Sequence, residues 1–143
     1  MAHMSVIYTG GQCMAKKMVD ISKLDNNQKI RALFKIFKKY LPLHKPVKLI
    51  IRDLAYDDGM CGWAGDGRKG FVISINKSLC YNCKIDTLIH EYAHAITMAQ
   101  NTYDPKEDHD KSWGEQFAVT YRCFLEHWPE YNDNKEPRLI ERL

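Results

Sequence analysis

The chain has 143 residues, of which 27% are charged, and a formal net charge of +3. A chain of this length fits one domain that can bury a core without disulfide bonds. No apolar run approaches the ~20 residues needed to cross a bilayer, which excludes a membrane-spanning protein. The mild positive charge is compatible with a nucleic-acid partner but does not require one. We therefore expect a single-domain monomer without a membrane partner.

The N-terminus and the cysteines indicate a location in the cytoplasm. The first residues lack the apolar stretch and cleavage site of a signal peptide, and residues 1–4 are expected to be a cloning remnant, with Met4 as the natural start. The five cysteines are an odd number in a chain without an export signal. Such a set favours reduced thiols in a cytosol-like compartment.

The segment 5–24 gives few structural signals, and the first clear element is a helix that Asp25 can cap. Apolar residues recur at helical spacing as far as Leu41, and Pro42 then ends the helix. Basic residues occupy the other face of the segment 29–39. We interpret this face as solvent-exposed, with a weak contact to DNA as the functional alternative.

Three strands are expected next. The segment 47–52 alternates apolar and polar residues, and the dipeptide Asp66-Gly67 predicts a hairpin between strands near 60–64 and 70–76. We therefore expect a three-stranded antiparallel sheet.

Two helices are expected to complete the domain. The first should begin at a capping Asp86 and reach about Gln100, and a loop with Pro105 should lead to a second helix at about 110–127. Residues 129–143 are expected to form a polar C-terminal tail, with a short helical turn near its end. A helix, a sheet and two further helices predict an α+β domain.

The expected helix after the strands carries the motif His90-Glu91-Tyr92-Ala93-His94. Successive helical residues are ~100° apart, so the two histidines lie on one face, one turn from each other. Two such imidazoles can bind one zinc ion, and the neighbouring Glu91 can reach a water on the metal. This pattern is typical of metal-assisted hydrolysis. Two ordinary core histidines are the alternative interpretation.

A catalytic zinc site has three protein ligands and one open position. His109, which begins the next helical segment, is the preferred third ligand, because the preceding loop is long enough to bring it back to the first two. Glu115, in that helix, is the alternative. Tyr92, Tyr121 and Arg122 are candidate donors to a developing oxyanion, although each is also explained as a structural residue.

The motif Cys80-x-x-Cys83 precedes the expected metal-binding helix. A structural zinc site would need two further ligands, of which only Cys61 is a plausible neighbour. A redox pair would be expected in a thioredoxin-like βαβ unit, which the predicted order of elements lacks. The sequence therefore predicts two reduced, unpaired thiols.

The stretch from Cys61 to Phe117 resembles the SprT-like, or Spartan-type, zinc metalloproteases. The resemblance rests on Gly62-Trp63-Ala64, Ile73-Ser74-Ile75-Asn76, the segment Thr87–Ala95, and His109 followed by Trp113. The His-Glu-x-x-His motif occurs in many zincins, whereas its combination with His109 and Trp113 is more specific. On this basis residues 5–128 are interpreted as a SprT-like domain of the small phage or bacterial type.

The resemblance implies a minimal zincin-like fold that binds Zn²⁺ through His90, His94 and His109. It also implies that Glu91 is the general base of a hydrolase, and that an edge strand pairs with an extended protein or peptide substrate. Family members often act on DNA-associated proteins through separate DNA-binding segments, and here only the helix at 29–39 could take that role.

Two functions of another class remain as alternatives. One is a zinc-holding binding or regulatory module, phage or bacterial, with little hydrolytic activity. Glu91 argues against it, because a purely structural zinc site does not need that carboxylate. The other is a phage-encoded protein that captures a host factor, for which the sequence offers no distinguishing residue.

Overall fold

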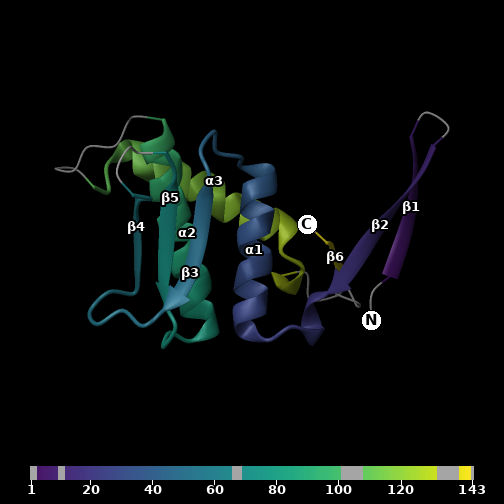
Figure 1. Cartoon of the computed structure of the whole chain (residues 1–143), viewed down its shortest axis with the longest axis horizontal. Coiled ribbons are helices and arrows are strands. Elements are labelled where there is room, and N and C mark those ends of the chain that lie inside the picture. Colours follow the sequence, from purple (N-terminus) through teal and green to yellow (C-terminus); the bar gives the residue numbers. More distant parts are fainter. Residues whose placement is uncertain (1–2, 10–11, 66–68, 101–107, 132–138, 143) are drawn as a thin grey trace.

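The computed structural model describes residues 3–9, 12–65, 69–100, 108–131 and 139–142. Within these ranges the chain forms three α-helices and two small sheets, in agreement with the expected α+β class (Figure 1). The helices are α1 (Asn26–Tyr40), α2 (Tyr81–Ala99) and α3 (Lys111–His127). One sheet contains β3 (Val47–Arg52), β4 (Gly59–Trp63) and β5 (Phe71–Asn76). The other contains β1 (His3–Thr9), β2 (Gln12–Asp20) and β6 (Leu139–Glu141).

Helix α1 begins where the sequence predicts. The Asp25 carboxylate accepts a hydrogen bond from the Gln28 backbone N–H at 2.8 Å, and the Gln28 side chain accepts one from the Asp25 N–H at 2.9 Å. This reciprocal pair satisfies two backbone donors that the first helical turn leaves without partners. The apolar face is buried from Ile30 to Phe37, as the helical spacing indicates.

The expected fully antiparallel sheet is wrong for β3. Strand β5 lies between the other two, antiparallel to β4 but parallel to β3, with Val47 opposite Phe71 and Ile51 opposite Ile75. Local hairpin rules favour a meander in sequence order, whereas here the strand with the most buried residues lies at the centre of the sheet. That strand is β5, where Phe71, Ile73 and Ile75 are at most 1% exposed. The predicted turn at Asp66-Gly67 lies outside the described residues.

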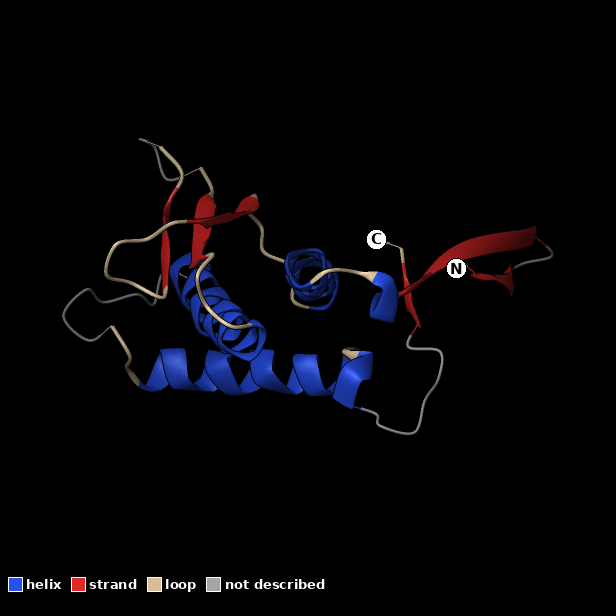
Figure 2. Ribbon diagram, turned by 90° about the horizontal axis from the view of Figure 1, so that it is seen from below, coloured by secondary structure: helices blue, strands red, loops and turns tan. Residues whose placement is uncertain are grey.

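Helix α2 packs against the β3–β5–β4 sheet and against both other helices. Figure 2 shows it beneath the β3–β5–β4 sheet, with α3 on its other side and α1 alongside. The Tyr92 ring packs against Phe34 and Phe37, and its hydroxyl donates a 2.7 Å hydrogen bond to the Leu41 carbonyl. These contacts join α2 to α1.

Helix α2 begins earlier than the sequence predicts. Its N-cap is Cys80, whose Sγ accepts a hydrogen bond from the Cys83 N–H at 3.3 Å, and not Asp86, which lies within the second turn. Aspartate is a much stronger capping signal than cysteine, so capping preference alone placed the start too late.

The second sheet is absent from the sequence prediction. Strands β1 and β2 form a hairpin that extends away from α1 in Figure 1, and β1 begins at His3, inside the segment expected to be a cloning remnant. Strand β6 pairs Ile140 with Val19 of β2, where a polar tail with a short helical turn was expected. A three-residue strand has too few positions to show alternation, and its pairing partner lies far away in the sequence.

Gly59 allows β4 to lie close to α2, which gives a first prediction. A Cβ atom at this position would lie 2.4 Å from Thr87 Cγ2, 3.1 Å from Glu91 Cγ and 3.2 Å from the Ser74 carbonyl oxygen. Gly59→Ala should therefore lower the free energy of unfolding by about 1–3 kcal/mol, the usual cost of overpacking. Urea unfolding would measure the change.

Gly62 of the same strand is the matched control. A Cβ atom there would have nothing within 4 Å, so Gly62→Ala should leave the free energy of unfolding nearly unchanged. Equal effects of the two substitutions would show that β4 does not pack against α2 as described.

Candidate metal centre

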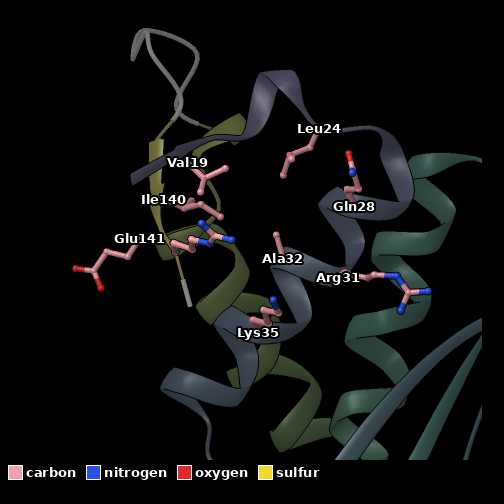
Figure 3. Close-up of a pocket in the computed structure, with 9 residues that line it drawn as sticks. Val19, Leu24, Gln28, Arg31, Ala32, Lys35, Ile140 and Glu141 are labelled. Carbon is pink, nitrogen blue, oxygen red and sulfur yellow. The ribbon is translucent and has the colours of Figure 1, made fainter. Parts of the chain in front are cut away.

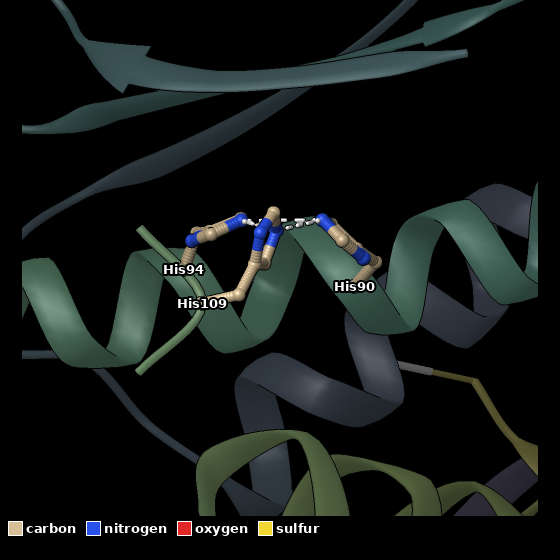
Figure 4. Close-up of side chains that lie close together, drawn as sticks. All are labelled: His90, His94 and His109. Atoms are coloured by element: carbon tan, nitrogen blue, oxygen red, sulfur yellow. Dashed lines mark hydrogen bonds between the residues drawn. The ribbon is translucent and has the colours of Figure 1, made fainter. Parts of the chain in front are cut away.

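Three histidine side chains meet on one side of α2. The Nε2 atoms of His90 and His94 are 3.2 Å apart, those of His94 and His109 are 3.2 Å apart, and those of His109 and His90 are 3.0 Å apart. Figure 4 shows the three rings converging, two from α2 and one from the segment before α3. Among the described residues, this is the group of histidine, cysteine and acidic side chains that could hold a metal ion.

The triangle of nitrogen atoms has the dimensions of a tetrahedral metal site. Zinc–nitrogen distances of ~2.0–2.1 Å place the ligands of a tetrahedral ion about 3.3 Å apart, close to the separations found here. Without an ion the arrangement is unfavourable. A neutral imidazole carries a single N–H, so three Nε2 atoms in mutual contact cannot all form hydrogen bonds with one another. The residues therefore fit a metal ion of this kind.

Local structure explains how the third histidine reaches the other two. His109 lies just before α3, whose N-cap Asp110 accepts a 2.9 Å hydrogen bond from the Trp113 backbone N–H. This cap fixes where the loop ends and the helix begins. Glu115, the alternative third ligand, is exposed on α3, where its carboxylate lies 4.0 Å from the Lys111 ammonium. The structure thus brings together His90, His94 and His109 and leaves Glu115 apart.

Trp113 forms one wall of the site. Its ring centroid lies 4.9 Å from that of His90, 5.5 Å from that of His94 and 4.6 Å from that of His109. Its indole N–H donates a long 3.4 Å hydrogen bond to the His90 carbonyl. The sequence assigned Trp113 to the apolar stripe of its helix, whereas the structure also places it against all three imidazoles.

The electrostatic surroundings favour neutral imidazoles on α2. Burial lowers the pKa of His94 to about 4, against the opposing effect of the Asp108 carboxylate, and burial also lowers the pKa of His90. Neutral rings at pH 7 keep the nitrogen lone pairs that a metal requires. His94 Nδ1 is buried without a hydrogen-bond partner, and Asp108 Oδ1 lies 3.8 Å from it.

Glu91 lies beside the histidines without joining them. Its side chain is 9% exposed, and Oε1 is 4.0 Å from His90 Nε2. Burial, with help from the charges of Asp108 and Asp57, raises the pKa of Glu91 to about 7. A carboxyl group poised near neutral pH can both accept and donate a proton, as a general acid–base catalyst must.

Glu91 and His90 line a hollow of about 330 Å³ between α2 and the start of β4. Asp58, Gly59, Asp86 and Thr87 complete its lining. No local pattern marks Gly59 or Asp108 as site residues, because their role depends on the packing of β4 against α2 and on the position of Asp108 beside His94.

Several residues considered from the sequence lie away from this hollow. The Tyr92 hydroxyl is bonded to Leu41 on the side of α1, and Arg122 lines a groove with Tyr40. Tyr121 packs against Phe117 and Phe124 along α3. None of these three contributes to the described lining of the hollow beside Glu91.

A larger hollow of about 490 Å³ lies between α1 and the β2–β6 pair (Figure 3). Val19, Leu24, Ala32 and Ile140 give it an apolar floor, and Arg31 and Lys35 stand at its edge. It shares no lining residue with the histidine cluster. Size alone therefore does not mark the site in this protein.

Comparison with models of protein families, with characterised proteins and with solved structures found no match to this chain. In the described part of the chain, the helices are too short or too polar to span a membrane. The case for a function thus depends on the site itself.

The histidine cluster predicts that metal content depends on His109. His109→Ala removes one of three converging nitrogens and should cause a large loss of zinc, measured by elemental analysis of the purified protein. His44→Ala is the control, because His44 is exposed and outside the cluster. Undiminished zinc in His109→Ala, together with loss in Glu115→Ala, would make Glu115 the third ligand.

The burial of Glu91 predicts a pH-dependent effect in metal-free protein. The folded pKa of about 7 lies above the ordinary value of 4.5, so the folded chain binds this proton more tightly, and ionisation destabilises the fold as pH rises through 7. Glu91→Gln removes this ionisable group and should therefore raise the free energy of unfolding. The increase should be about 2 kcal/mol larger at pH 8 than at pH 5. Urea unfolding with a chelator present would measure it, and a gain independent of pH would contradict the buried carboxyl.

Proposed function

We propose that this protein is a zinc-dependent metallopeptidase of the SprT-like type. One observation carries the proposal: three histidine nitrogens converge at tetrahedral spacing, with the buried carboxyl of Glu91 directly beside them. Within the described residues three ligands meet, and not four, which leaves a position for substrate and water. A structural zinc site is usually closed by four ligands.

In this proposal His90, His94 and His109 hold the zinc. Zinc bound there would supply Lewis-acid chemistry, which polarises a peptide carbonyl and makes water more acidic. Glu91 would accept the proton of the attacking water and then donate it to the leaving amine, as a general acid–base catalyst does. Trp113 holds the three imidazoles in place and limits access of water from its side.

The substrate would be an extended protein or peptide segment. Strand β4 has β5 on one side, and among the described strands none pairs with its other edge. It lies next to Glu91 through Gly59, at the hollow that His90 and Glu91 line. A peptide added as a further strand would thus lie beside Glu91.

A contact to DNA is a secondary part of the proposal. Within α1, Lys29 pairs with Glu130 at 3.3 Å and Lys39 with Glu141 at 2.7 Å. The remaining basic positions are Arg31, Lys35 and Lys38, which are exposed. Any DNA contact would depend on this smaller set and would weaken as salt is added.

The test of the peptidase proposal is Glu91→Gln. Glutamine keeps the shape of the side chain and leaves the three ligands intact, but cannot act as a base. Since general acid–base catalysis contributes about 10²–10⁴-fold, hydrolysis should fall by at least the lower figure while zinc content is retained. Cleavage of unfolded casein and of the protein itself would be followed by mass spectrometry, with and without single-stranded DNA.

Glu126→Gln is the matched control, because Glu126 is an exposed carboxylate near the end of α3, outside the hollow. It should cut at the wild-type rate. If wild type and Glu91→Gln hold zinc and cut equally slowly on every substrate, the peptidase proposal fails. The zinc-holding binding or regulatory module would then be the better interpretation.

A further inference from the structure

The proposed function makes no use of Cys80 and Cys83, which stand at the N-terminus of α2. Their sulfur atoms are 2.9 Å apart, and both side chains are exposed. The Cys83 backbone N–H donates to Cys80 Sγ at 3.3 Å, which orients the Cys80 sulfur toward the helix terminus. Two thiols in contact at a helix N-terminus are a recognised setting for thiolate chemistry.

The junction before the motif is held in place from several sides. The Asn76 side-chain amide donates to the Leu54 carbonyl at 2.8 Å and to the Asp57 carbonyl at 3.1 Å. The Asn76 side-chain oxygen in turn accepts from the Ser78 backbone N–H and hydroxyl at 3.1 and 2.9 Å. These bonds join the end of β5 to the turn that leads into Cys80. The two thiols are thus presented from a fixed turn.

The junction before the motif has the local order of a redox motif, although the described strands do not form the βαβ unit in which such a pair would be expected. Strand β5 is parallel to its neighbour β3 and leads through a short turn into Cys80 and the helix that covers the sheet. This is the order strand, Cys-x-x-Cys, helix. The crossover between the parallel strands is β4 and not a helix, so the likeness to a thioredoxin-like unit is confined to this junction.

A structural zinc site at these thiols has no support in the described part of the chain. Cys61 was the candidate additional ligand, but its sulfur contacts Met98 Sδ at 3.9 Å, near the other end of α2. The grouping of possible metal ligands in the described residues contains the three histidines and neither cysteine.

We propose that Cys80 and Cys83 form a dithiol–disulfide couple that exchanges with disulfide substrates. The Cys80 thiolate attacks one sulfur of a disulfide RS–SR, which forms a mixed disulfide on Cys80 and releases one thiolate. Cys83 gives its proton to solvent and attacks the Cys80 sulfur, which releases the second thiolate. The protein loses two electrons and two protons overall, and RS–SR is reduced to two thiols.

The assignment of roles follows from the surroundings of each sulfur. The hydrogen bond with the Cys83 side chain lowers the pKa of Cys80, and the Cys83 backbone N–H acts in the same direction. The same side-chain contact raises the pKa of Cys83. Cys80 is therefore the attacking sulfur and Cys83 the resolving one.

The couple can be tested without reference to peptide hydrolysis. The full chain is reduced, freed of reductant and treated with oxidised glutathione; remaining thiols are then alkylated and the peptides mapped by mass spectrometry. Wild type should give a disulfide between Cys80 and Cys83. Cys83→Ser should accumulate a mixed disulfide with glutathione on Cys80. Cys80→Ser, which keeps a good helix cap, should react on Cys83 at least about tenfold more slowly.

Cys61→Ser and Cys123→Ser are the controls and should behave as wild type. Circular dichroism would establish that each variant is folded, since Cys80 and Cys83 are exposed but Cys61 is half-buried and Cys123 is buried. Wild type without a disulfide between Cys80 and Cys83 would overturn the couple. Equal rates of reaction with oxidised glutathione on Cys80 in Cys83→Ser and on Cys83 in Cys80→Ser would overturn the assigned roles. Neither result bears on the peptidase proposal, which is tested through Glu91.

Discussion

The burial of helix α2 between the sheet and α3 is the constraint on which the rest of this structure depends. Every residue from Glu91 to Ala99 is buried, and Leu88 and Ile89 before them are fully buried as well. A helix packed on so many sides has little freedom to rotate or shift. His90 and His94 therefore hold a fixed direction, and the site needs only one further ligand from elsewhere in the chain.

That same burial places polar groups where they are unfavourable. His94 and Glu91 are among the few buried polar side chains, and His94 Nδ1 has no hydrogen-bond partner. Groups of this kind cost free energy in a core, and apolar contacts such as those of Tyr92 with Phe34 and Phe37 must offset it. A cost of this sort is expected where a protein keeps residues for chemistry, and here it falls on a proposed metal ligand and on the proposed general base.

The first turn and the middle of α2 carry two different groups of reactive side chains. Cys83 and His90 are seven residues apart, which separates them by about 10 Å along a helix. The thiols belong to the exposed first turn, fixed by the turn after β5, whereas the histidines belong to the part that the sheet and α3 cover. Variants in one group can therefore be studied without altering the other.

The sequence by itself determined the local elements of this protein. Asp25 and Asp110 mark the starts of two helices because capping needs only neighbouring residues, and the spacing of His90 and His94 follows from helical geometry. It could not place β5 between β3 and β4, pair Val19 with Ile140, or begin α2 at Cys80. Those features depend on which distant segments exclude water from each other, and such pairings leave no local pattern. The tertiary structure alone decided that His109 and not Glu115 meets the other histidines, because the cap at Asp110 and the packing of Trp113 against all three rings place His109 beside them.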